Sequence, residues 1–92
     1  MNEILTTKTS RDDSIGMDVT ELTTSDGTFV IRSGSGHFYD VTPPGGELLL
    51  VNETQTIEAE GQPTQTEITL ENVSVLLLES INNEFTQLEF TS

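Results

Sequence analysis

Residues 21 to 32 read ELTTSDGTFVIR, and this stretch decides the class of fold. It places Asp26-Gly27, a strong signal for a two-residue β-turn, between two runs of β-prone residues. From Thr28 to the end, short runs of Thr, Val, Ile, Leu and Phe are broken at near-regular intervals by Gly, Pro and Asn. This pattern predicts an all-β protein whose strands follow one another along the chain.

The register of the hairpin follows from its turn. If Asp26 and Gly27 form the loop, Leu22 faces Ile31 and shares one face of the hairpin with it and with Phe29. The same register places Glu21 opposite Arg32. We therefore expect a cross-strand ion pair between these two residues, worth at most about 1 kcal/mol.

Turn signals divide the rest of the chain into further strands, among them the Pro43–Gly46 turn and the Gly61–Pro63 break. The Gln55–Glu60 stretch alternates, so Ile57 and Ala59 are expected to point inward. We expect these further strands at residues 37–41, 47–51, 55–60, around Ile68 and Leu70, and at 73–79 and 85–90. Seven or eight strands without a helix predict a small antiparallel β-sandwich or a jelly-roll-like barrel.

Composition sets the limits of this fold. The chain has 92 residues, of which 33% are hydrophobic, and it has no cysteine. One domain with a modest core is expected, without a disulfide framework or a zinc site. No apolar run approaches the ~18 residues of a membrane-spanning helix, and the N-terminus lacks the features of a signal peptide. We expect a soluble protein that is made in a cytoplasm.

The formal net charge of −13 is unevenly distributed along the chain. All three cations, Lys8, Arg11 and Arg32, lie in the first 32 residues, and the last sixty carry ten acidic residues and no basic one. Such a surface repels nucleic acids and anionic membranes, so neither is an expected partner. Protection from aggregation explains the acidity better than imitation of DNA does, because Thr and Ser dilute any phosphate-like array. A saline environment would also favour this composition.

Residues 1–17 differ from the rest because they are polar and have no hydrophobic period. We expect them to form an extended N-terminal arm, with residues 18–92 forming a single β-sandwich domain. Such a segment is disordered when it is free. A flexible tail and an arm held by a neighbouring subunit or a larger surface are both open.

Two apolar runs break the alternation of the strands. Leu48–Leu50 and Val75–Leu78 each have apolar side chains left over for the outer face of a sheet. One explanation is that the arm covers them through Ile4, Leu5 and Ile15. The other is a subunit interface, which we favour because a short chain has little material to cover both runs.

No stretch of the sequence assembles a catalytic constellation. His37 with Asp40 would be half of a metal or acid–base pair, but a second nitrogen ligand is missing. The acid pairs Asp12-Asp13 and Glu58 with Glu60 lack the spacing of a calcium loop, so solvated charge explains them better. We expect no enzyme activity, no cofactor and no metal.

The order of turns and strands resembles the small β-modules of virion surface proteins from tailed phages. Such modules occur in capsid decoration (cement) proteins, head fibres and tail fibres. Family members often have Trp where Phe85 stands, so this position departs from the pattern. The resemblance covers about residues 28–92 and is carried by Pro44-Gly45-Gly46, Leu48 to Asn52, Ile57, Leu70, Ser74 to Leu78, Asn82-Asn83 and Phe85. It implies a structural role, commonly as a trimer on a shell or fibre.

We therefore expect a non-enzymatic capsid decoration protein on the virion exterior, which binds the major capsid protein or another virion protein. It would form a homotrimer through Leu49, Leu76, Leu78 and Phe85. The arm would hold the shell through Ile4, Leu5, Lys8 and Arg11. A tail-fibre or baseplate module is the near alternative. An acidic inhibitor that imitates DNA is the alternative from another class, and salt would dissolve its complex.

Overall fold

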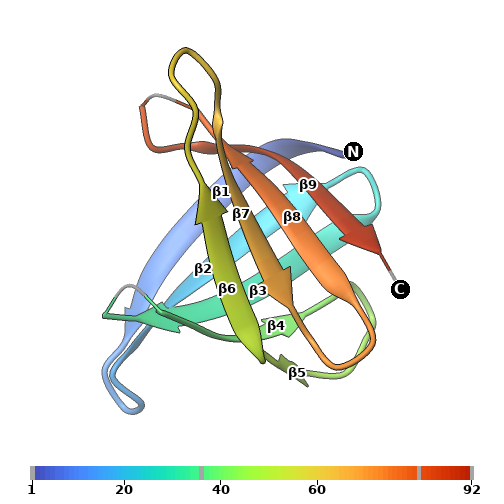
Figure 1. The fold of residues 1–92 in the computed structure, drawn as a ribbon. Coiled ribbons are helices and arrows are strands. Elements are labelled where there is room, and N and C mark those ends of the chain that lie inside the picture. The colour runs from blue at the N-terminus through green and yellow to red at the C-terminus, as the bar shows by residue number, and fades with distance from the viewer. Residues whose placement is uncertain (1, 36, 81, 92) are drawn as a thin grey trace.

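The computed structural model describes residues 2–35, 37–80 and 82–91. These residues form nine antiparallel strands and no helix, in one sheet of order β5-β4-β3-β2-β1-β9-β8-β7-β6 that curls into a half-barrel (Figure 1). The strands are β1 (Asn2–Asp12), β2 (Met17–Thr24), β3 (Gly27–Gly34), β4 (His37–Thr42), β5 (Leu49–Leu50), β6 (Glu53–Ile57), β7 (Thr64–Thr69), β8 (Ser74–Glu79) and β9 (Phe85–Thr91). No helix that could cross a membrane occurs among these residues. Met1, Gly36, Ile81 and Ser92 belong to predicted ranges but lie outside the described residues.

The predicted all-β class is confirmed, but the sandwich or jelly-roll and the separate arm are not. Most of the expected arm is strand β1, which pairs with β2 along residues 4–12. Its side chains are exposed on almost its whole length, which explains why they show no hydrophobic period. Thr is β-prone on such a surface, and the Thr9 and Thr20 hydroxyls lie 3.4 Å apart across the two strands.

The predicted hairpin is present as β2 and β3, but its register is wrong. Thr24 pairs with Gly27 and Leu22 with Phe29, so Ser25 and Asp26 form the loop. Gly27 has a φ of 121°, and a Cβ atom there would lie 2.7 Å from the Cβ of Pro44. Glycine is therefore required at the start of β3 rather than inside the loop.

The expected Glu21–Arg32 pair is wrong for the same reason. Glu21 lies opposite Val30, and Arg32 lies opposite Val19 on one side and Asp40 on the other. The Arg32 guanidinium instead donates to the Asp40 carboxylate at 3.3 Å.

The core lies inside the curl, between the N-terminal half-sheet (β1–β5) and the C-terminal half-sheet (β6–β9). Phe29 and Phe90 connect the two halves, with ring centroids 5.5 Å apart. Leu22, Phe29 and Ile31 were predicted to share one face, and all three point into this core. The buried apolar residues are Leu22, Phe29, Ile31, Val41, Ile68, Leu70, Val75, Leu77 and Leu88.

The two half-sheets meet at two places. At one, Asn2 and Glu3 of β1 pair with Leu88 and Gln87 of β9. At the other, the chain between β5 and β6 bonds to both halves: the Val51 N–H donates to the Tyr39 carbonyl at 3.1 Å, and the Asn52 N–H donates to the Thr69 carbonyl at 2.8 Å. The curl is thus held in the middle of the strand order, where β1 meets β9, and near its two edge strands, β5 and β6.

The inward orientation predicted for Ile57 and Ala59 is wrong. Every residue of β6 is exposed, and Ile57 retains 47% of its accessible surface. Ile57 pairs with the exposed Gln65 of β7, so the register places it on the outer face of the sheet. Ala59 lies beyond the end of β6 and is exposed.

Candidate interaction site

Strand β1 has one edge that is largely unpaired. It pairs with β9 only through Asn2 and Glu3, and then the two strands diverge. In residues 5–12, the edge that faces away from β2 has no strand partner among the residues described. The register also shifts between Ile4 and Thr6, which leaves Leu5 without a partner in β2. An open edge of this kind can accept a further strand.

A groove of about 630 Å³ runs along this edge. Ile4 and Phe85 contribute apolar surface to it and also pack against the protein's own core. Leu5 is 62% exposed beside them. The lining residues come from β1, from the turn into β9 and from the start of β9: Glu3, Ile4, Leu5, Thr6, Thr7, Thr9, Asn83, Glu84, Phe85, Thr86 and Gln87.

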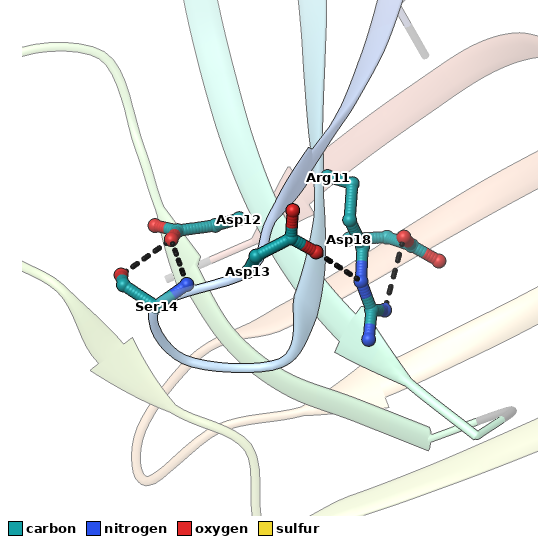
Figure 2. A network of polar contacts seen from close by, with 5 residues as sticks. All are labelled: Arg11, Asp12, Asp13, Ser14 and Asp18. Atoms are coloured by element: carbon teal, nitrogen blue, oxygen red, sulfur yellow. Dashed lines mark hydrogen bonds and ion pairs between the residues drawn. The ribbon is translucent and has the colours of Figure 1, made fainter.

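The far end of β1 carries fixed charges, which Figure 2 shows at the turn into β2. The Arg11 guanidinium lies 3.7 Å from the Asp13 carboxylate and 3.3 Å from that of Asp18. Lys8 lies opposite Glu21 in the sheet. The cations of the expected arm are therefore displayed on a strand.

Asp12 shapes the same turn. The Ser14 hydroxyl and amide donate to its carboxylate at 2.5 and 3.1 Å (Figure 2). The hydroxyl is the main cause of a lowered Asp12 pKa, and the amides of Ser14 and Ile15 and the charge of Arg32 act in the same direction. Partial desolvation opposes them. The turn thus favours an ionised Asp12.

A second apolar surface lies at the other edges of the sheet. Leu48 and Leu50 are 47% and 70% exposed around a groove of about 620 Å³, which Glu47 and Glu71 also line. Ile57 is exposed on the neighbouring edge strand β6. Two of the three leucines in this run are therefore left uncovered.

The structure does not bring the four expected self-association residues together. Leu49 and Phe85 pack against the core. Leu49 turns inward because it pairs with the buried Val41, so Leu48 and Leu50 are the exposed members of that run. An unbroken apolar run contains no alternation from which this could be predicted.

Leu76 and Leu78 do share the outer face of β8, where both are half-buried. Glu67 and Glu89 lie on either side of Leu76 in the neighbouring strands. Gln65 and Gln87 flank Leu78 in the same way. Long polar side chains can cover neighbouring apolar groups with their stems. A role of these leucines in self-association stays a prediction.

The residues expected to anchor a shell all lie on β1. Ile4 is half-buried against the core, while Leu5, Lys8 and Arg11 are exposed. The structure joins Ile4 and Leu5 to Phe85 in one groove, although the sequence placed them in separate sets. No local signal predicts this contact, because it depends on the pairing of the first and last strands. Shell binding by these residues stays a prediction.

The polar residues considered for chemistry are separate from one another. The Asp40 carboxylate accepts from Arg32, and His37 is exposed at the start of β4. Within residues 2–35, 37–80 and 82–91, no three His, Cys, Asp or Glu side chains lie where they could hold a metal ion.

Comparisons of the chain with protein-family models, with curated proteins and with solved structures found no match.

Proposed function

We propose that this is a non-enzymatic structural protein that acts by self-association and by binding a larger protein assembly, as a capsid decoration protein does on a virion. The observation that carries the proposal is the exposure of Leu5, Leu50 and Ile57 on three strands with open edges. An exposed apolar edge is an aggregation hazard for a monomer, and a specific strand partner removes it.

The small core supports the same proposal. Nine buried apolar side chains stabilise a sheet of nine strands. Burial of further apolar surface between copies would add stability that depends on protein concentration. A homotrimer on the outer surface of a shell combines both effects. In this proposal the half-barrel takes the place of the sandwich or jelly-roll module, and β1 takes the place of the arm.

Binding to a shell would use β1. Its exposed Leu5, Lys8 and Arg11 lie on one strand. An acidic outer surface of a capsid protein would complement the two cations. The groove beside Ile4 and Phe85 would receive an apolar side chain of the partner. A tail-fibre or baseplate module would use the same surfaces.

The first test is the solution mass of the full chain, by light scattering after size exclusion, over a range of concentrations and at low and high salt. We expect a trimer that persists at high salt, because apolar contacts and main-chain hydrogen bonds are screened little. A monomer at every concentration would remove self-association from the proposal. A monomer that binds a DNA-binding protein and releases it in salt would favour the inhibitor that imitates DNA.

A further inference from the structure

We propose that the open edge of β1 in one copy pairs with the open edge of β6 in a second copy, so that the copies join head to tail. This inference rests on the proposed self-association and names the two surfaces that produce it.

Both strands have an edge available. Beyond Glu3, β1 is paired only with β2, and β6 is the last strand of the sheet and pairs only with β7. Both are exposed along nearly their whole length. They are also rich in Thr, which favours β-pairing. Each strand can therefore offer its unpaired N–H and C=O groups to the other.

The two edges carry opposite charge. Residues 4–11 contain Lys8 and Arg11 and no acidic residue, whereas residues 53–60 contain Glu53, Glu58 and Glu60 and no basic residue. Arg11 already contacts Asp13 and Asp18 and Arg32 contacts Asp40, whereas Lys8, although it lies opposite Glu21, forms no ion pair within 4.0 Å among the described residues. Two acidic residues also line the β1 groove: Glu3, where β1 pairs with β9, and Glu84, in the turn into β9.

Charge also argues against pairing like with like. Two β1 edges would bring the cations of both copies together, and two copies of residues 53–60 would bring together Glu53 of each β6 and the glutamates that follow it, Glu58 and Glu60. Like charges across an interface suppress the wrong partner. Pairing of β1 with β6 is the combination that brings opposite charges together.

Exposed apolar side chains complete the fit. Leu5 on β1 and Ile57 on β6 are both exposed in the single chain, at 62% and 47%. The groove beside Leu5 has room for a side chain from an added strand. Main-chain bonds and apolar contacts would provide affinity, and Lys8 with Glu53 and the glutamates just after β6 would select the edge. An interface between two different surfaces generates a ring when its rotation closes, so a trimer is compatible with it.

A charge-swap series tests the pairing. Lys8→Glu and Glu53→Lys each place like charges across the interface, and the double variant K8E/E53K restores opposite charges. We expect each single variant to raise the dissociation constant about tenfold, from light scattering at low salt, and the double variant to recover most of the loss. Glu89→Lys is the matched control, because Glu89 is exposed on β9, where it lies opposite Leu76 of β8, and belongs neither to residues 5–12 of β1 nor to β6.

The same series at high salt separates the contribution of charge from that of apolar contacts and main-chain hydrogen bonds. There the oligomer should persist, and the difference between the single and double variants should shrink. Circular dichroism checks that each variant folds.

The outcomes distinguish this inference from the proposed function. β1–β6 pairing would be overturned if neither single variant changes the dissociation constant, or if K8E/E53K does not recover it. Self-association would then use another surface. A wild-type protein that is monomeric at all concentrations would overturn both.

Discussion

The N-terminal and C-terminal half-sheets face each other across one core, but different forces stabilise them. In the N-terminal half-sheet, the ion pairs of Arg11 and Arg32 link neighbouring strands or turns. Residues 51–92 contain eight acidic residues and no basic one, so no such pair is available to the C-terminal half-sheet. That half instead contributes five of the nine buried apolar residues.

This difference shows how a small acidic protein limits repulsion between its carboxylates. In the C-terminal half-sheet, Leu76 separates Glu67 from Glu89 across three strands. Like charges directly opposite one another would destabilise the pairing, and an apolar residue between them avoids this. Leu76 therefore has a structural role of its own in the outer face of β8.

The largest effect should come from the core that both halves share. Leu22→Ala and Leu77→Ala remove fully buried side chains from opposite halves, and each should lower the free energy of unfolding by about 2–5 kcal/mol. Urea titration followed by circular dichroism measures this. If the halves are one cooperative unit, both variants give a single transition. A transition that splits for one variant would show that the halves unfold separately.

The next effect concerns the ion pair within the N-terminal half-sheet. Arg32→Met leaves Asp40, whose side chain is only 11% exposed, without its guanidinium partner, and should cost about 1–2 kcal/mol. Arg11→Met is the matched control: it removes an exposed pair and should cost less than about 1 kcal/mol. Thermal unfolding of both variants at low salt makes the comparison. Equal losses of stability in the two variants would show that burial of Asp40 does not strengthen the Arg32–Asp40 pair.

A smaller effect separates two adjacent leucines where the halves meet. Leu49→Ala removes a side chain that packs against the core and should cost about 1–2 kcal/mol. Leu50→Ala changes an exposed side chain and should change stability by less than about 0.5 kcal/mol. The measurement is urea unfolding at a concentration where the protein is monomeric. A larger loss of stability for Leu50→Ala than for Leu49→Ala would contradict the assignment of Leu49 as the inward residue of β5.

The smallest effect is a pH dependence in the turn after β1. Because the Asp12 pKa is lowered in the folded state, its carboxylate stabilises the protein fully above the pKa of the unfolded chain, near 4. That stabilisation is lost as the pH falls through the lower, folded pKa. Asp12→Asn should therefore make melting temperature less dependent on pH below about 4. Asp13→Asn is the control. If it changes the pH dependence of the melting temperature as much as Asp12→Asn does, the Ser14 contacts have no special role.

The inward face of β2, β3 and β7 could be predicted from sequence because it depends only on alternation. The expected pairing of Leu22 with Ile31 differs from the observed pairing with Phe29 by two residues, and such a shift leaves every side chain on the same face. The inward orientation of Ile68 and Leu70 was predictable for the same reason.

Long-range pairing could not be predicted. The contact of Asn2 with Leu88 joins strands from the two ends of the chain, and nothing in residues 2–12 or 85–91 signals it. Polar β1 lacks the alternation that identifies a strand. The groove beside Phe85 depends on where β1 lies relative to β9, so it could not be predicted either. Orientation within Leu48–Leu50 depends on the contact of Leu49 with Val41. These are the features on which the candidate interaction site rests.

The pairing of β1 with β9 has a consequence for the order in which the protein folds. Apart from this contact, the paired strands follow one another along the chain, so each hairpin can form by local loop closure. Joining β1 to β9 must instead close nearly the whole chain for only two paired residues on each strand. The topology therefore favours two meanders that form early and independently, and a late step in which the two ends of the chain lock the curl.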